Sequence, residues 1–222
     1  MISIIMPITQ QVKNEDIKLS IQSILEQTFT DYHIIIGINS SITTDTSYIK
    51  DYSAKIDIIY IDTDSKYDMI AKLLVYAPKE WITFIEPGDI WYNNKLHTQW
   101  DFTERYEIIG SGCHYVGRKN GMPNIPNCKI QEDSFLYGCP MVNNTLLIKK
   151  HLCKWNAYKY DIHADFNMLY KLFSKGTVGY NVPQVLSYCK ISIYNDIGTM
   201  SIDIHEKLIK KVRRKYNNRI YN

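Results

Sequence analysis

The sequence predicts a single α/β domain built on a mostly parallel β-sheet flanked by helices. Short apolar runs alternate with helical patterns from residue 2 to residue 85. A length of 222 residues suits one sizeable core, and no linker divides the chain. Alternating strands and helices are typical of parallel sheets with right-handed crossovers. Such sheets bind ligands at the carboxyl ends of their strands.

The first half of the chain carries the clearest pattern. Apolar runs too short for helices predict strands at residues 2–6, 34–38, 58–61 and 81–85. Apolar residues at helical spacing, after an Asn-Glu-Asp start at Asn14, predict a helix before the second strand. Further helices are expected near residues 48–55 and 69–77.

The second half has a less regular pattern. Helices are expected near residues 95–106, 144–152 and 162–173, and strands at residues 108–116, 178–180 and 186–191. A loop rich in Gly, Pro and Asn lies at residues 119–127. A basic helix is expected at residues 204–216, and it forms a separate C-terminal segment over residues 201–222.

Composition excludes several classes of protein. Lys and Arg number 26 against 23 Asp and Glu, a net charge of +3, and much of the excess lies after residue 206. A nucleic-acid binder would need a basic stripe over its surface, so no nucleic acid is expected as a partner. The five cysteines form no CxxC pair, and no signal peptide or membrane span is visible. These features predict a cytoplasmic protein with reduced thiols.

An acidic turn at residues 86–89 is the most informative segment. The apolar strand at 81–85 leads directly into Glu86-Pro87-Gly88-Asp89, and Pro-Gly favours a type II turn. Carboxylates at the mouth of a parallel strand suit a divalent cation, which stabilises a leaving diphosphate. Taken alone, the same residues also fit a solvated acidic turn.

Several segments together resemble the family-2 glycosyltransferases. Residues 81–96 resemble the segment in which a strand ends in Asp-x-Asp-Asp and is followed by Ile-Trp and Lys-Leu. Residues 2–7 and 19–29 resemble the first strand and first helix of that family. Residues 66–72, 138–142 and 163–165 resemble its later motifs, in the family's order. The resemblance covers residues 2–191.

The resemblance implies a GT-A type, Rossmann-like fold with a nucleotide-binding half at residues 1–96 and an acceptor half at residues 97–200. The implied activity moves a sugar from a nucleoside-diphosphate donor, such as a UDP-sugar, to a hydroxyl of a glycan or other acceptor, with inversion. Glu86 and Asp89 are implied as ligands of a divalent cation, Mn²⁺ or Mg²⁺. The nucleotide is implied to contact Pro7, Asn39, Lys66, Asp68 and Glu86.

The departures from the family pattern leave an alternative open. Gly88 stands where the family has its principal metal-binding Asp, so the cation site is rearranged or lost. Asn39-Ser40-Ser41 replaces the usual Asp-Gly-Ser, although the Asn39 amide can still pair with a pyrimidine edge. The alternative is a degenerate domain that binds nucleotide or glycan, or acts as a scaffold, without catalysis.

Asp165 is the candidate catalytic base. It lies at the edge of an apolar helical stripe, near the expected helix start, where the helix dipole keeps a carboxylate ionised. An ionised carboxylate can take the proton of an acceptor hydroxyl. The competing role is a cap that satisfies amides of the first turn. Spacing alone does not separate the two, and the resemblance favours the base.

Lysines and the C-terminal helix each have two interpretations. Lys66 and Lys72 are either phosphate contacts or solvated side chains on a helix. The basic helix either docks through its apolar stripe, which is favoured, or makes a peripheral membrane contact. The sequence contains no Walker, GxGxxG, GxSxG or HExxH motif, so NTPase, dehydrogenase, esterase and zinc-protease functions have no support.

Overall fold

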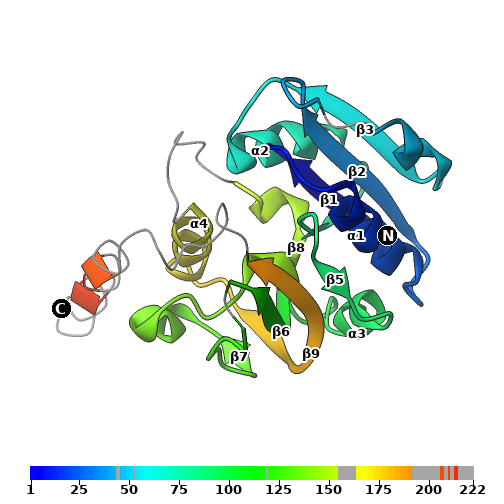
Figure 1. Cartoon of the computed structure of the whole chain (residues 1–222). Helices are drawn as coiled ribbons and strands as arrows, with labels where there is room; N and C mark the ends of the chain where they lie inside the picture. The colour runs from blue at the N-terminus through cyan, green and yellow to red at the C-terminus, as the bar shows by residue number, and fades with distance from the viewer. Residues whose placement is uncertain are drawn as a thin grey trace.

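A computed structural model describes residues 1–43, 46–52, 54–118, 120–154 and 164–191, and residues 206, 207, 210, 213 and 214. The described residues form an α/β fold around one mixed sheet, with helices on both faces (Figure 1). The strand order is β3-β2-β1-β4-β8-β6-β9-β5, and β7 pairs with β9 outside this path. The sheet therefore runs through both halves of the chain.

The elements have the following bounds. The strands are β1 (Ile2–Ile8), β2 (Tyr32–Asn39), β3 (Ile56–Ile61), β4 (Trp81–Phe84), β5 (Ile90–Trp91), β6 (Ile108–Gly117), β7 (Lys129–Ile130), β8 (Leu147–Lys149) and β9 (Gly179–Ile191). The α-helices are α1 (Asn14–Leu25), α2 (Lys66–Tyr76), α3 (Lys95–Trp100) and α4 (Ala164–Phe173). The 3-10 helices are η1 (Ser47–Asp51), η2 (Glu132–Tyr137), η3 (Asn143–Thr145) and η4 (Lys150–Leu152).

Strands β3, β2, β1 and β4 form a parallel group. Their carboxyl ends share one edge because Ile8 pairs with Ile38 and Ile5 pairs with Phe84. Pro7 is tolerated inside β1 because β4 pairs only as far as Ile5, so no β4 carbonyl needs an amide hydrogen at Pro7. This edge is where the predicted nucleotide residues lie.

The second half of the sheet is mixed. Strand β8 is antiparallel to β4 and β6, whereas the long strands β6 and β9 are parallel. Their register shifts around Gly112, where Pro183 and Gln184 of β9 form a bulge. The shift lets β9 continue to Lys190, beside the end of β4.

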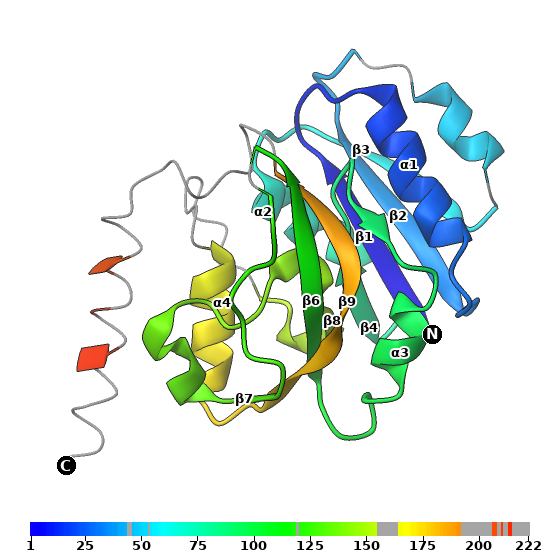
Figure 2. The ribbon, with the colours of Figure 1, turned by 60° about the horizontal axis from the view of Figure 1, so that its bottom comes forward.

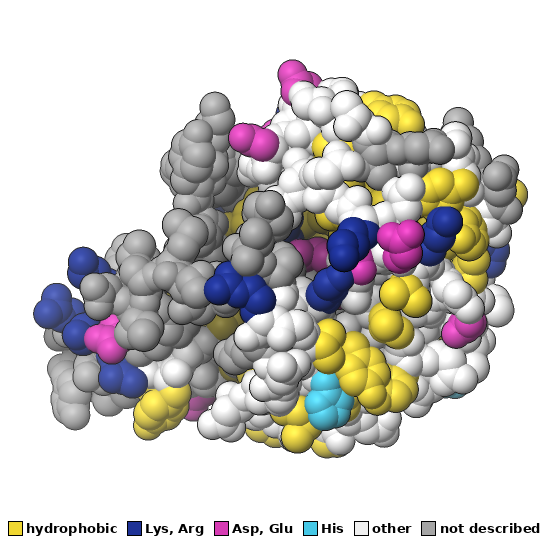
Figure 3. Space-filling model, viewed as in Figure 1, with side chains coloured by type: hydrophobic (Ala, Val, Ile, Leu, Met, Phe, Trp, Pro, Cys, Tyr) yellow, Lys and Arg dark blue, Asp and Glu magenta, His cyan; other side chains and the backbone are white. Residues whose placement is uncertain are grey.

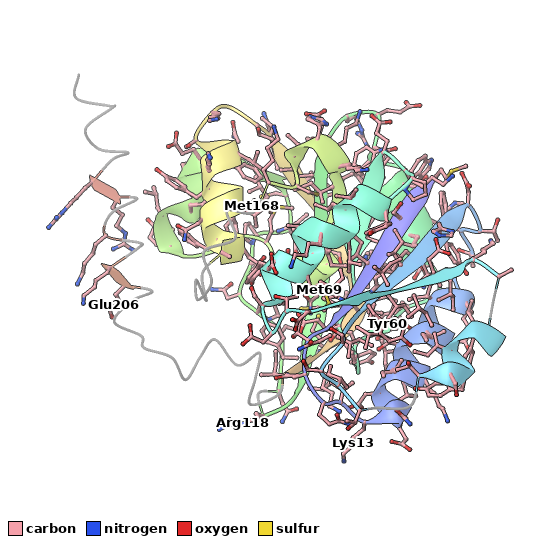
Figure 4. All side chains as sticks on the ribbon, turned by 90° about the horizontal axis from the view of Figure 1, so that it is seen from above. Lys13, Tyr60, Met69, Arg118, Met168 and Glu206 are labelled. Atoms are coloured by element: carbon pink, nitrogen blue, oxygen red, sulfur yellow. The ribbon has the colours of Figure 1, made fainter. Side chains whose placement is uncertain are left out.

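Two cores cover the two faces of the sheet. Alternate residues of β1 point to opposite sides: Ile4 and Met6 belong to the core that includes α1, and Ile5 belongs to the core that includes α2 and α4. Figure 2 shows α1 on one face and α2 and α4 behind the other. Met69 of α2 and Met168 of α4, labelled in Figure 4, belong to the same core. This shared core brings the first turns of α2 and α4 close to each other.

The α/β fold class and all four strands predicted for the first half are confirmed. The predicted helix at residues 144–152 is wrong, because β8 occupies its centre with η3 and η4 on either side. Leu147 and Ile148 are fully buried between β4 and β6, and an apolar run this short fits a strand or a helix equally well. The predicted strands at 178–180 and 186–191 are one bulged strand, β9.

Two predicted helices are shorter or tighter than expected. The helix near residues 48–55 is the 3-10 helix η1, and the helix at 95–106 ends at Trp100 and continues as turns. Helix α1 begins at Asn14 itself, with Lys13 in the N-cap position. The predicted C-terminal helix lies mostly outside the described residues, although residues 206, 207, 210, 213 and 214 are helical.

Within the described ranges, no helix is both long and apolar enough to cross a membrane.

Lys95, at the start of α3, is fully buried and gives a testable pH dependence. Its Nζ donates to Gln99 Oε1 at 2.7 Å and lies 4.3 Å from the Trp91 ring centroid. Burial lowers the pKa of Lys95 to about 7, so the fold favours the neutral amine. Because the lysine pKa is lower in the folded state, the unfolded protein binds the extra proton between the two pKa values. The stability from this difference is complete above the unfolded-state pKa and is lost as pH falls towards 7.

We therefore expect wild type to gain about 2 kcal/mol in free energy of unfolding, relative to Lys95→Met, between pH 7 and pH 9. Urea denaturation of both proteins at the two pH values measures this difference. A constant difference between the two proteins would contradict the buried neutral amine.

Candidate functional site

The acidic turn after β4 is a type II turn anchored on α1. Asp89 N donates to Glu86 O at 2.9 Å, and Gly88 has φ +94°, as the third position of this turn requires. The buried Ser20 hydroxyl accepts from Gly88 N at 2.9 Å and donates to Asp89 O at 2.7 Å. The turn geometry predicted from Pro-Gly is confirmed, and Ser20 fixes its position.

Asp89 is a buried carboxylate with both oxygens hydrogen-bonded. Its side chain is 1% exposed. Oδ1 accepts from Lys190 N at 2.8 Å, and Oδ2 accepts from Glu86 N at 3.2 Å and Asn144 Nδ2 at 2.8 Å. Burial, and next the nearby Glu86 charge, raise the pKa of Asp89 to about 7. Asp89 therefore ties the turn to β9 and η3.

Gly88 is covered by an ion pair between β9 and α1. Lys190 Nζ lies 2.6 and 2.7 Å from the two carboxylate oxygens of Asp16. A Cβ added at Gly88 would lie 2.4 Å from Lys190 Cδ and 3.5 Å from Asp16 Cγ. Positive φ and this close approach both favour glycine here. The space that a carboxylate side chain at position 88 would use therefore holds the Lys190 side chain.

Four residues from three separate segments form what we call the central cluster: Lys66, Tyr67, Glu86 and Asp165. Lys66 Nζ lies 2.5 Å from Glu86 Oε1 and 5.3 Å from the Tyr67 ring centroid. The Tyr67 hydroxyl donates to Asp165 Oδ2 at 2.8 Å. The cluster links the end of β4 to the first turns of α2 and α4.

Electrostatics fix the protonation states of Lys66 and Tyr67. Burial alone would lower the pKa of Lys66, but the Glu86 carboxylate, with Tyr67 and Asp165, raises it well above its ordinary value. Burial, and next the Asp165 charge, raise the pKa of Tyr67 well above its ordinary value. At neutral pH, Lys66 is an ammonium ion and Tyr67 is a hydroxyl donor.

The other predicted nucleotide residues lie at the same edge of the sheet. Pro7 is buried in β1, level with the end of β4. Asn39 Nδ2 donates to Thr9 O at 3.2 Å, and its Oδ1 accepts from Ser41 N at 3.1 Å, so the amide joins the ends of β1 and β2. Asp68 lies in the first turn of α2, where its carboxylate pairs with Lys72 at 2.8 Å.

Solved structures share this arrangement of elements. The chain is similar to TarS residues 1–349 from S. aureus in complex with UDP, with a TM-score of 0.73 and 13% identity over 98% of this chain and 71% of that one. It is also similar to TarS in complex with UDP-GlcNAc, with a TM-score of 0.71 and 14% identity over 86% of this chain and 58% of that one. The chain has the GT-A fold. The resemblance stated from the sequence is thereby confirmed at the level of the fold.

A second GT-A protein with a similar structure is the mannosyltransferase PcManGT from Pyrobaculum calidifontis in complex with GDP-Man and Mn²⁺. Its TM-score is 0.64, with 13% identity over 86% of this chain and 56% of that one. The sequence itself matches no protein-family model and no curated protein. The chain spans less than two thirds of several GT-A chains that it matches, including 43% of a longer TarS chain.

The residues at the end of β4 do not fit a divalent cation as they are folded in this GT-A chain. Glu86 pairs with Lys66, both Asp89 oxygens accept hydrogen bonds, and Gly88 brings no side-chain ligand. Across the described ranges, no group of three or more His, Cys, Asp or Glu side chains could hold a metal ion. A cation here would have to displace the Lys66 ammonium from Glu86 or the hydrogen-bond donors from Asp89.

Sequence reasoning missed several residues of this candidate site: Asp16, Ser20, Tyr67 and Lys190. Tyr67 lies within residues 66–72, a segment that the resemblance singled out, so the sequence did point to its neighbourhood. Its hydrogen bond to Asp165 was not predicted. Lys190 and Asp16 are separated by most of the chain, and nothing in their local sequence predicts an ion pair. His163, beside Asp165 in the resemblance, lies outside the described residues.

A separate hollow of about 720 Å³ lies between α2 and η4. Its mainly apolar lining includes Ala71, Leu74, Val75 and Cys153, and Glu80, Lys150, His151 and Lys154 also line it. None of the predicted site residues lines it. The predicted nucleotide residues therefore lie elsewhere, at the carboxyl ends of the parallel strands.

Proposed function

We propose that this protein is a glycosyltransferase that moves a sugar from a nucleoside-diphosphate donor to an acceptor hydroxyl, with inversion. The observation that carries the proposal is the central cluster. It joins a charged turn at the carboxyl end of a parallel strand to a carboxylate on a second element. Sugar transfer needs both a group that meets the diphosphate and a base that meets the acceptor.

The donor would lie along the carboxyl ends of β1, β2 and β4. Structures with a similar fold hold UDP, UDP-GlcNAc and GDP-Man, so a nucleotide sugar is the proposed donor. A UDP-sugar is the first candidate. Asn39 and Asp68 would flank the base and ribose, since both lie at this edge. Lys66 would meet the diphosphate as a charged donor.

Asp165 would act as the general base toward the acceptor hydroxyl. The Tyr67 hydrogen bond holds one of its carboxylate oxygens, and the first turn of α4 favours its ionised form. A base held this way can take the hydroxyl proton as the acceptor oxygen attacks the anomeric carbon and the nucleoside diphosphate leaves. Attack opposite the leaving group gives inversion, and no covalent sugar–enzyme intermediate is needed.

A non-catalytic nucleotide-binding or scaffold domain is the second candidate. It is favoured by Asp89, whose carboxylate is buried and occupied by hydrogen bonds within the protein. In that case the central cluster would bind a ligand without turning it over. Product formation separates the two candidates.

The experiment is a screen of UDP, GDP and their common sugar derivatives by calorimetry, followed by measurement of nucleoside-diphosphate release. We expect saturable binding of one nucleoside diphosphate at micromolar to millimolar concentration and slow release from the matching sugar donor. Binding without release, even with a panel of hydroxyl acceptors, would favour the non-catalytic domain. Absence of binding to every nucleotide would remove the proposed function.

A further inference from the structure

A row of alternating charges marks the carboxyl end of β4. Lys66 pairs with Glu86 from the α2 side, and Lys190 pairs with Asp16 over Gly88. The face of the molecule in Figure 3 shows basic and acidic side chains gathered in a strip across its middle. Both pairs lie against the turn where a nucleotide-sugar diphosphate would arrive under the proposed function.

In each pair the lysine is more exposed than its carboxylate. The exposed fractions are 25% for Lys66 against 15% for Glu86, and 37% for Lys190 against 18% for Asp16. A ligand that arrives from solvent therefore meets ammonium groups in front of the carboxylates. Such an arrangement favours an anion over a cation as the incoming ligand.

The carboxylates also hold the ammonium groups in position. An ammonium ion has three hydrogen-bond donors, and Glu86 Oε1 receives one donor of Lys66 in the described structure. The ion pair restricts a long, flexible side chain, so less entropy is lost when a phosphate oxygen binds it. A divalent cation promotes diphosphate departure by placing positive charge at the leaving group, and a preorganised ammonium ion can do the same.

We infer that Lys66, assisted by Lys190, neutralises the donor diphosphate in place of a divalent cation, so that binding and transfer proceed without metal. This inference rests on the proposed function. As the bond between the anomeric carbon and the diphosphate oxygen breaks, both electrons stay on that oxygen. The Lys66 ammonium stabilises the resulting charge by hydrogen bonding and keeps its proton.

The test uses the full chain with UDP and UMP as probes, in EDTA and then with added Mn²⁺ or Mg²⁺. We expect UDP to bind in EDTA with a dissociation constant within about threefold of its value with metal. UDP should bind more tightly than UMP, because only UDP carries the second phosphate. Loss of one charge-assisted hydrogen bond corresponds to a change of about 10- to 100-fold in affinity.

Lys66→Gln should therefore weaken UDP binding about 10- to 100-fold and leave UMP binding nearly unchanged, so the UDP preference collapses. Lys66→Arg keeps the charge and should retain most of the preference. Lys149→Gln is the matched control, since Lys149 pairs with Glu80 at 2.8 Å near the opposite end of β4. A merely structural role for Lys66 would weaken both nucleotides equally.

The outcomes separate this inference from the proposed function. UDP binding that requires Mn²⁺ or Mg²⁺ would overturn the inference and leave the nucleotide-sugar proposal in place. An unchanged ratio of UDP to UMP affinity in a folded Lys66→Gln variant would overturn it as well. Failure of UDP and GDP to bind in any condition would remove both proposals. The EDTA comparison uses wild type alone, so it stands even if Lys66→Gln fails to fold.

Discussion

Asp165→Asn is expected to lower the rate of sugar transfer by about two to four orders of magnitude, the usual contribution of a positioned general base. The amide has nearly the shape of the carboxylate but cannot take a proton from the acceptor. Donor affinity should change little, because the amide oxygen can still accept the hydrogen bond that the Tyr67 hydroxyl donates to Asp165. The measurements are kcat with the matching donor and acceptor, and the dissociation constant of the nucleoside diphosphate.

The competing role of Asp165 as a capping residue predicts the opposite pattern. Its place in the first turn of α4 allows a carboxylate to satisfy backbone amides. As a cap only, Asp165→Asn would stay active, and Asp165→Ala would lose about 1 kcal/mol in free energy of unfolding. An Asp165→Asn enzyme with wild-type kcat would therefore contradict the assignment of Asp165 as the general base. Tyr67→Phe removes the hydrogen bond to Asp165 and tests whether orientation of the carboxylate matters.

The parts of the fold predicted from sequence are those with strong local signals. Apolar runs placed β1, β2 and β4 within one or two residues of their observed ends, because strands buried on both faces read as continuous hydrophobic segments. The Pro-Gly pair predicted the type II turn, since proline suits its second position and glycine readily adopts the positive φ of its third. Strand β8 could not be recognised, because three residues carry no usable periodicity.

Some residues of the candidate site were predicted, but their contacts were not. Lys66, Glu86 and Asp165 were all singled out, and the fold brings them into one cluster with Tyr67. Which lysine meets which carboxylate depends on how α2 and α4 pack on the sheet, and local sequence does not encode that packing. Asp89 shows the limit most clearly: an aspartate after a turn looks exposed, yet it is buried by β9 and η3.

Asp89→Ala is expected to lower the free energy of unfolding by about 3–5 kcal/mol at pH 5, which is a loss of roughly 10 °C or more in melting temperature. The substitution leaves three donors inside the protein without their acceptor: the amides of Glu86 and Lys190 and the side-chain amide of Asn144. Each unsatisfied buried donor costs about 1–3 kcal/mol, and partial relaxation of the turn reduces the total.

The pH dependence distinguishes a structural Asp89 from a metal ligand. A carboxyl pKa raised to about 7 in the fold contributes stability that is complete below the unfolded-state pKa and is lost as pH rises through 7. The deficit of Asp89→Ala should therefore shrink by about 2 kcal/mol between pH 5 and pH 8. Urea denaturation at both pH values measures this change. The control is Asp31→Ala, which removes an exposed ion pair with the N-terminus and should change stability by less than about 1 kcal/mol. If Asp89→Ala instead keeps wild-type stability at both pH values and loses Mn²⁺-dependent nucleotide binding, Asp89 is a metal ligand. In that case the hydrogen bonds by which Asp89 links the turn after β4 to β9 and η3 do not stabilise the fold.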